Sequence, residues 1–272
     1  MPADGAAACE NCEAELVGAF CHECGQAARS PSGSLAAFGR DVVADVANLD
    51  AKALRTARLL LTRPGELTAE FLRGRRVRYV QPVQVYLAAV ALFFVVNAFR
   101  PFVTFDLATR RIVSSLNAAA ISGTLSAEKA AELARAGVPL AVYRERFENV
   151  VTGYQPTFLI GSVLLFALVL ALLFRGAPGG YVRHAVFALH WTAFYLLLMI
   201  VQALAGHAAG TRGWIGAALA LAALGYLLLA LRRVYGQPWL ATTIKGALLY
   251  VVFQALIVVW MLSAIAFAFA MT

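Results

Sequence analysis

Four cysteines near the N-terminus have the spacing of metal ligands. They form two Cys-x-x-Cys pairs, Cys9 with Cys12 and Cys21 with Cys24, and the sequence has no other cysteine. Each tight turn can present two thiolates to one ion, and four thiolates complete the tetrahedral shell of a structural Zn²⁺ site. A pair of disulfides or a redox Cys-x-x-Cys is the alternative, which a cytosolic location disfavours. We therefore predict a minimal zinc ribbon over residues 1–28, with Zn²⁺ as a structural cofactor that supplies most of its folding free energy.

Polar side chains inside apolar stretches form a second group with possible chemistry: His184, His190, Gln202 and Gln254. Polar and ionisable groups at membrane depth are functional hypotheses by default. His184 and His190 are six positions apart, about 240° around a helix, so they cannot share one metal ion on a straight helix. For His190 we favour a structural helix–helix hydrogen bond. Residues 157–272 contain no Asp or Glu, which argues against a proton-coupled carrier and an intramembrane metalloenzyme.

A third group is basic and marks the start of the membrane region. Arg73, Arg75, Arg76 and Arg78 fall within six residues and shortly precede an uncharged apolar run. Because Lys and Arg resist translocation and are attracted to the anionic inner leaflet, the cluster predicts a cytosolic N-terminal side and an anionic-lipid partner. A role in topology alone stays open. Nucleic acid is disfavoured as a partner because lipid is the nearer polyanion.

The segment between the ribbon and the first span, residues 29–82, is predicted to hold basic amphipathic helices in the cytosol or at the membrane interface. Caps, apolar periodicity and helix breakers predict three of them, covering Ser34 to about Asn48, Asp50 to Arg63, and roughly Glu66 to Leu72.

The remaining chain, residues 83–272, is predicted to be a transmembrane domain. The sequence is 61% hydrophobic and only 14% charged, far more apolar than an average soluble domain. Five apolar runs are long enough or nearly so to cross a bilayer, namely roughly Val83–Phe99, Phe158–Phe174, Ala185–Ala205, Trp214–Leu231 and Gly246–Met271. An outer loop over residues 100–156 is expected to cover the outer ends of this five-helix domain.

The distribution of bases predicts the orientation of these spans. The loops on the side of the N-terminus would carry five bases, Arg175, Arg183, Arg232, Arg233 and Lys245, whereas the short opposite loop carries only Arg212. This asymmetry places the N-terminus in the cytosol and the C-terminus outside. The first residues show no pattern of a cleavable signal peptide.

Three motifs carry a resemblance to a known family. They are Cys9-x-x-Cys12 with Cys21-x-x-Cys24-Gly25-Gln26, Arg63-Pro64-Gly65 with Gly74-Arg75-Arg76, Tyr79 and Pro82, and Tyr181-x-x-His184-x-x-Phe187-x-x-His190-x-x-x-Phe194. At these residues the chain resembles the domain-of-unknown-function family 3667, bacterial membrane proteins with an N-terminal zinc-ribbon-like motif. The resemblance implies a protein of the bacterial inner membrane and supplies no activity.

The sequence therefore predicts an all-α membrane protein with about five transmembrane helices, preceded by a minimal four-cysteine zinc ribbon and amphipathic helices. No Ser-His-Asp arrangement, phosphate loop or nucleotide fingerprint appears. We predict a non-enzymatic inner-membrane protein whose zinc ribbon forms a cytosolic platform for a protein partner. The alternative is a small transporter or channel built on polar groups of the third and fifth spans. An intramembrane enzyme centred on His184 and His190 is a distant third hypothesis.

Overall fold

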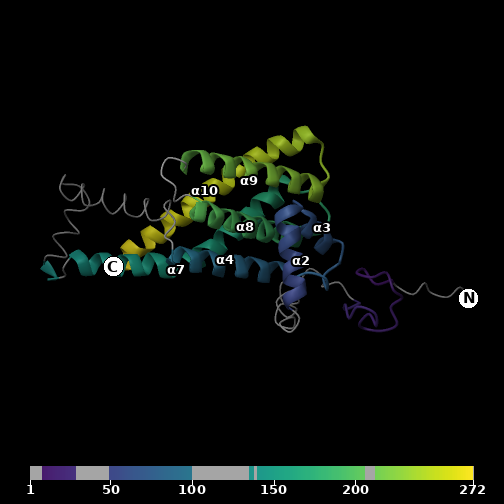
Figure 1. Ribbon diagram of the computed structural model, residues 1–272. Helices are drawn as coiled ribbons and strands as arrows, with labels where there is room; N and C mark the ends of the chain where they lie inside the picture. The colour runs from purple at the N-terminus through teal and green to yellow at the C-terminus, as the bar shows by residue number, and fades with distance from the viewer. Residues whose placement is uncertain (1–7, 29–48, 100–134, 138–139, 206–211, 272) are drawn as a thin grey trace, which may run out of the picture.

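A computed structural model describes residues 8–28, 49–99, 135–137, 140–205 and 212–271, and within these ranges its regular elements are helices (Figure 1). The helices are α2 (Leu49–Thr62), α3 (Glu66–Leu72), α4 (Pro82–Phe99), α7 (Leu140–Leu173), α8 (Gly180–Ala205), α9 (Arg212–Tyr235) and α10 (Trp239–Met271). The two helices predicted between Asn48 and the first span are confirmed: α2 ends just before Arg63, and α3 has the predicted bounds. The helix predicted from Ser34 and most of the outer loop, residues 100–134, lie outside the described residues.

Four of the described helices, α7, α8, α9 and α10, are long and apolar enough to cross a membrane, as in a multi-pass membrane protein. The helix α4 is equally apolar but shorter, with 18 residues. At 1.5 Å per residue it measures about 27 Å, slightly less than a hydrocarbon core of about 30 Å. Four spans are thus supported by length and composition, and the fifth, at α4, stays a prediction.

The helix α7 begins earlier than the sequence predicted. It is continuous from Leu140 and carries Pro156 inside it, so residues 140–156 extend a membrane-length helix instead of closing the outer loop. The reason lies in its packing. Phe147 and Val151 of this segment are 3% exposed and form a small core with Ile265 and Ala268 of α10. This contact between distant parts of the chain favours helix over loop.

The long helices run side by side, with α8 as their most buried member (Figure 1). α8 packs against α4, α7 and α9 and carries a core built around Trp191. The Trp191 ring meets Phe253 of α10 edge-on at 5.4 Å between centroids, and Phe253 meets Phe166 of α7 at 5.1 Å. Aromatic contacts of this geometry help to fix the position of neighbouring helices beyond the area they bury.

The helices α2 and α3 lie at the end of the bundle where α9 ends and α10 begins, with α2 crossing the long helices (Figure 1). Two hydrogen bonds attach them there: the Tyr226 hydroxyl donates to the Leu60 carbonyl at 2.6 Å, and Arg233 Nη1 donates to the Pro64 carbonyl at 2.8 Å. α3 is buried over most of its length and packs on α8 and α9. α3 is thus covered by the long helices, and its predicted place at the cytosolic side or the membrane interface stays a prediction.

Candidate metal centre

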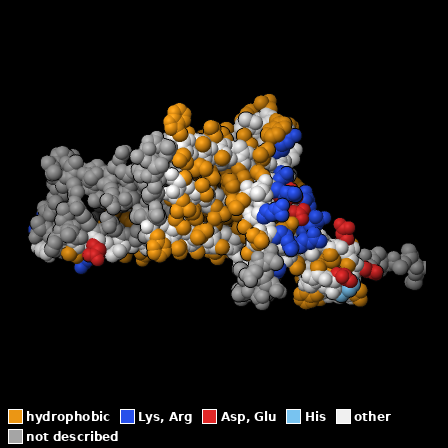
Figure 2. All heavy atoms as spheres, in the orientation of Figure 1, with side chains coloured by type: hydrophobic (Ala, Val, Ile, Leu, Met, Phe, Trp, Pro, Cys, Tyr) orange, Lys and Arg blue, Asp and Glu red, His pale blue; other side chains and the backbone are white. Residues whose placement is uncertain are grey.

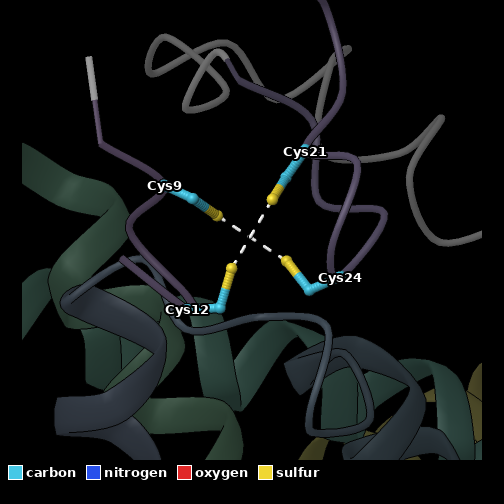
Figure 3. Close-up of side chains that lie close together, drawn as sticks. All are labelled: Cys9, Cys12, Cys21 and Cys24. Carbon is cyan, nitrogen blue, oxygen red and sulfur yellow. Dashed lines mark hydrogen bonds between the residues drawn. The ribbon is translucent and has the colours of Figure 1, made fainter. Parts of the chain in front are cut away.

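The four cysteine side chains converge on one point from two loops of residues 8–28, which we call the cysteine module (Figure 3). All four Sγ atoms lie within 4.8 Å of one another, with Cys9 3.6 Å from Cys24 and Cys12 3.5 Å from Cys21. A Zn–S distance of about 2.3 Å places the sulfurs of a regular tetrahedron about 3.8 Å apart. The thiols are free, not joined in disulfides. The donor set therefore fits one tetrahedrally bound metal ion.

The module is built from one turn used twice, twelve positions apart. Cys9 N donates to the Ala14 carbonyl, and its own carbonyl accepts from Glu13 N; Cys21 N donates to the Gln26 carbonyl, and its carbonyl accepts from Gly25 N. The residue after each second cysteine has a positive φ, 65° at Glu13 and 73° at Gly25. Each turn is closed by a single antiparallel bridge, Ala8 with Glu15 and Phe20 with Ala27. The sequence prediction named the two cysteine pairs but missed this internal repeat, whose signal is the matching offset of both pairs.

The thiols of the cluster do not ionise equally. Burial raises the pKa of Cys9, but hydrogen bonds from the backbone N–H groups of Cys12 and Asn11 and from neighbouring thiols outweigh it and lower the pKa to about 7. At Cys12 a backbone hydrogen bond at Ala14 lowers the pKa, whereas burial and the adjacent thiols raise it to about 12. One thiolate thus forms readily, and its negative charge makes ionisation of the next thiol less favourable. A bound cation offsets the repulsion between the thiolates because it stabilises all four together.

The cysteine module is docked on the loop between α3 and α4, residues 73–81, which we call the basic loop. Gln26, which is buried, donates through Nε2 to the Gly74 carbonyl at 2.8 Å and accepts through Oε1 from Arg76 N at 3.3 Å. Gly74 has φ 88°, and a Cβ there would overlap the side chain of Glu10. The module is therefore attached to the helical part of the chain through these contacts of Gln26 as well as through residues 29–48.

The four arginines predicted as a basic cluster lie in this loop, and two of them are held by Glu70 of α3. Arg73 Nη1 lies 2.7 Å from Glu70 Oε1, and Arg75 Nη1 lies 3.3 Å from Glu70 Oε2. Glu70 is only 6% exposed, so these pairs fix the loop on α3. Arg76 lies over the Phe71 ring, 5.1 Å from its centroid, and Arg78 is exposed.

Lys and Arg side chains gather in a band between the apolar surface of the helices and the cysteine module (Figure 2). This band also affects Tyr79, a buried residue of the basic loop. Burial and then the Glu70 carboxylate raise the pKa of Tyr79, against the lowering effect of Arg78 and Arg55. The role of the arginines toward lipid stays a prediction.

The histidine predicted at membrane depth, His190, has its partner on α3. Its Nδ1 lies 2.9 Å from the Thr68 hydroxyl, and both residues are buried. Thr68 and His190 are 122 residues apart, and the partner belongs to the segment before the first span. Sequence reasoning expected a partner on a neighbouring helix and did not identify Thr68, whose type and position carry no local signal.

The other polar residues predicted inside the apolar helices do not meet at one site. His184 Nδ1 lies 2.8 Å from the Tyr235 hydroxyl, and the two rings stack with centroids 5.6 Å apart. Gln202 of α8 and Gln254 of α10 are both half-buried. Among the described residues, the four cysteines are the group of His, Cys, Asp and Glu side chains placed to hold a metal ion.

These observations define a helical protein with membrane-length apolar helices and, docked at one end, a module whose four cysteines could hold a metal ion. Residues 50–94, which include α3, the basic loop and nearly all of α2, match a family model described as Protein of unknown function (DUF3667). The match confirms the family resemblance that the motifs indicated. No curated protein and no solved structure matches this chain.

Proposed function

We propose that this chain is a non-enzymatic protein of the bacterial inner membrane whose cysteine module, loaded with Zn²⁺, serves as a cytosolic interaction platform for another protein. The observation that carries the proposal is the docking of the module through the buried amide of Gln26. A module attached by a flexible linker alone would present its surface in many orientations, whereas this one has a defined position on the helices.

The choice of Zn²⁺ follows from the donor set. Four thiolates in a tetrahedron favour Zn²⁺ or an iron–sulfur centre, and a complete shell leaves no open position for catalysis. The metal would therefore supply folding free energy to a module that has almost no core of its own.

The docked module leaves two large apolar side chains accessible. Val17 is 84% exposed and Phe20 is 67% exposed, and both lie between the two cysteine pairs. Aromatic and aliphatic side chains displayed on a rigid support are suited to act as anchors at a protein–protein interface. We assign the partner contact to this segment, residues 17–20.

Site-specific photo-cross-linking in native membranes tests the platform. A photoreactive residue at Phe20 is expected to give a discrete protein adduct, which disappears in the Cys9→Ser/Cys24→Ser variant because the module loses its fold. The matched control is a photoreactive residue at Trp214, which is 84% exposed and lies near the N-terminal end of α9. Equal protein adducts from both positions, or an adduct that survives loss of the metal, would contradict the platform.

A small transporter or channel is the second candidate, and one observation favours it. Several buried polar atoms of the apolar helices have no hydrogen-bond partner among the described residues: Tyr86 Oη, His190 Nε2, Trp191 Nε1, Thr192 Oγ1 and Gln254 Oε1. Buried polar groups are normally paired, so water or a passing solute would complete them. Proton flux into proteoliposomes, followed with a pH-sensitive dye, tests this candidate. If the wild-type protein carries a proton flux and both His190→Leu and His190→Gln abolish it, the transporter or channel is favoured over the platform.

A further inference from the structure

A cavity of about 520 Å³ lies where α7 turns into α8 and where α9 turns into α10. Three cations from three different segments line it: Arg175 of the first turn, Arg183 of α8 and Lys245 of α10. Tyr235, the last residue of α9, and Gln237 of the second turn also line it. Its volume lies within the range of small-molecule sites in proteins.

Nothing in the neighbouring sequence neutralises these three cations. Residues 157–272 contain no Asp or Glu. Within the part of the chain that the structure describes, the ion pairs involve other bases, such as Arg73, Arg75 and Arg233. The cavity therefore concentrates positive charge, which attracts an anion.

Part of this charge has a structural use. Arg183 Nη1 donates to the Val234 carbonyl at 3.3 Å, and Lys245 Nζ donates to the Leu173 carbonyl at 3.1 Å. Both carbonyls belong to the last turns of helices, where cations are favourable.

The two hydrogen bonds to helix-end carbonyls use only some of the N–H donors of Arg183 and Lys245. Arg has five N–H donors and Lys has three. Arg183 Nε is buried without a partner among the described residues, and so is Gln237 Oε1. The cavity thus holds an unpaired buried donor and an unpaired buried acceptor beside two further cations.

We propose that this cavity binds the phosphate group of an anionic phosphate ester, with Arg183 and Lys245 as its donors and Arg175 adding to the positive potential. Gln237 Oε1 accepts a hydrogen bond from a hydroxyl group of the same ligand. The cysteine module is not part of this site, so the site is independent of the platform.

Two sources can supply this chemistry. One is the headgroup of an anionic phospholipid such as phosphatidylglycerol, because Leu172 and Leu173, at the end of the membrane-length apolar stretch of α7, also line the cavity. Basic pockets between membrane helices recognise such headgroups. The other source is a soluble phosphate ester that enters from the aqueous side.

The test uses Gly176, which lines the cavity and whose Cβ would meet open space. Gly176→Glu adds a carboxylate at the lining of the cavity without removing either helix cap, and Gly176→Gln is the uncharged control. The full-length chain in detergent is titrated with phosphatidylglycerol and followed by native mass spectrometry. A parallel titration with glycerol 3-phosphate is followed by calorimetry. We expect Gly176→Glu to weaken binding about tenfold or more, since a like charge near the phosphate is costly in a partly desolvated site, and Gly176→Gln to bind as wild type.

A second pair of variants removes the donors themselves. Arg183→Gln with Lys245→Gln is expected to abolish the same binding, whereas Arg232→Gln, which removes a base stacked on Trp239 at 4.2 Å, leaves it unchanged. Melting temperatures confirm that each variant is folded. Binding of phosphatidylglycerol alone assigns the site to lipid, and binding of glycerol 3-phosphate alone assigns it to a soluble ester. If neither ligand binds, or if Gly176→Glu binds both as tightly as wild type, the proposal is overturned.

Discussion

At the scale of single residues, two uncharged side chains connect segments that are far apart in the sequence. The Gln26 amide links the cysteine module to the basic loop, 48 and 50 residues away, and the Thr68 hydroxyl links α3 to His190. A buried polar group left without its partner costs about 1–3 kcal/mol. These bonds are therefore suited to select one docked arrangement over alternatives.

Gln26→Ala is expected to release the cysteine module from the basic loop while leaving its metal in place. The variant leaves the Gly74 carbonyl and Arg76 N without their partner, at a cost of about 1–3 kcal/mol to docking. Hydrogen exchange should become faster at the Arg76 amide, and metal content should stay at the wild-type value. Glu23→Ala, at a side chain 66% exposed, is the control. Unchanged exchange at Arg76 would show that other contacts dock the module.

Thr68→Val is expected to destabilise the helices by about 1–2 kcal/mol, because it removes the hydroxyl beside His190 Nδ1 and keeps the shape of the side chain. Thr68→Ser keeps the hydroxyl and should retain more of the stability. Thermal unfolding in detergent, combined in a double-mutant cycle with His190→Leu, measures the coupling. Strictly additive effects of the two substitutions would show that the hydrogen bond contributes nothing.

At the scale of elements, α3 joins the basic loop, on which the cysteine module is docked, to the long helices. Its seven residues carry Glu70 toward Arg73 and Arg75, and Thr68 toward His190. On its first turn, Glu66 Oε2 lies 3.4 Å from Arg233 Nε of α9. An isolated helix of this length is not stable in water, so these tertiary contacts are what hold it.

Gly65, which precedes α3, is the position where this attachment is most sensitive. Its φ is 74°, and a Cβ would lie 2.8 Å from the backbone of Ala230 in α9. Gly65→Ala is therefore expected to cost about 1–3 kcal/mol for its backbone conformation and more for displacing α3. Gly236→Ala is the matched control, because Gly236 has φ 65° and open space around its Cβ. Melting temperatures compare the two; an equal loss of stability would show that α3 does not depend on this close approach.

The fold of the cysteine module is expected to depend on its metal, whereas the fold of the helices is not. Wild-type protein should contain about one Zn²⁺ per chain, and Cys9→Ser/Cys24→Ser should contain none, since structural zinc supplies about 10–16 kcal/mol in small modules. Elemental analysis measures the loss, and circular dichroism should show the helical signal retained. His22→Ala, between two ligands but at an exposed side chain, is the control that keeps the metal. Zinc at the wild-type level in the double variant would refute the assignment.

The sequence predicted the features that depend on residues close together in the chain. The cysteine spacing identified the residues that converge as candidate metal ligands, and the Arg63-Pro64 and Gly74 breakers located α3. The sequence could not show that α3 is buried, that Gln26 docks the module, or that α7 begins at Leu140. Each of these depends on contacts between residues distant in the chain, which periodicity and capping do not report.

At the scale of the whole molecule, the bases of the basic loop and those near the α7–α8 and α9–α10 turns lie at one end of the long helices. Lys245 and Arg183 bond to the ends of α7 and α9, and Arg233 reaches Pro64 beside α3, so these bases lie at the same end as the basic loop (Figure 2). The C-terminal end of α10 lies at the other end, away from the cysteine module (Figure 1). Bases near the ends of membrane helices influence orientation, and the orientation of this chain stays a prediction.

The basic loop is expected to contribute to that orientation through charge and to stability through geometry, and two sets of substitutions separate these effects. Replacing Arg73, Arg75, Arg76 and Arg78 by Gln removes four bases, each worth about 1 kcal/mol near an anionic surface, and should weaken the predicted outward placement of the C-terminus. Replacing the same four by Lys keeps the charge but loses the guanidinium contacts with Glu70, so orientation should be preserved while the melting temperature falls. Reporter fusions at the C-terminus measure orientation, and thermal unfolding measures stability. If the Gln variant keeps the wild-type orientation, the bases of the later turns, such as Arg232 and Arg233, determine the topology instead.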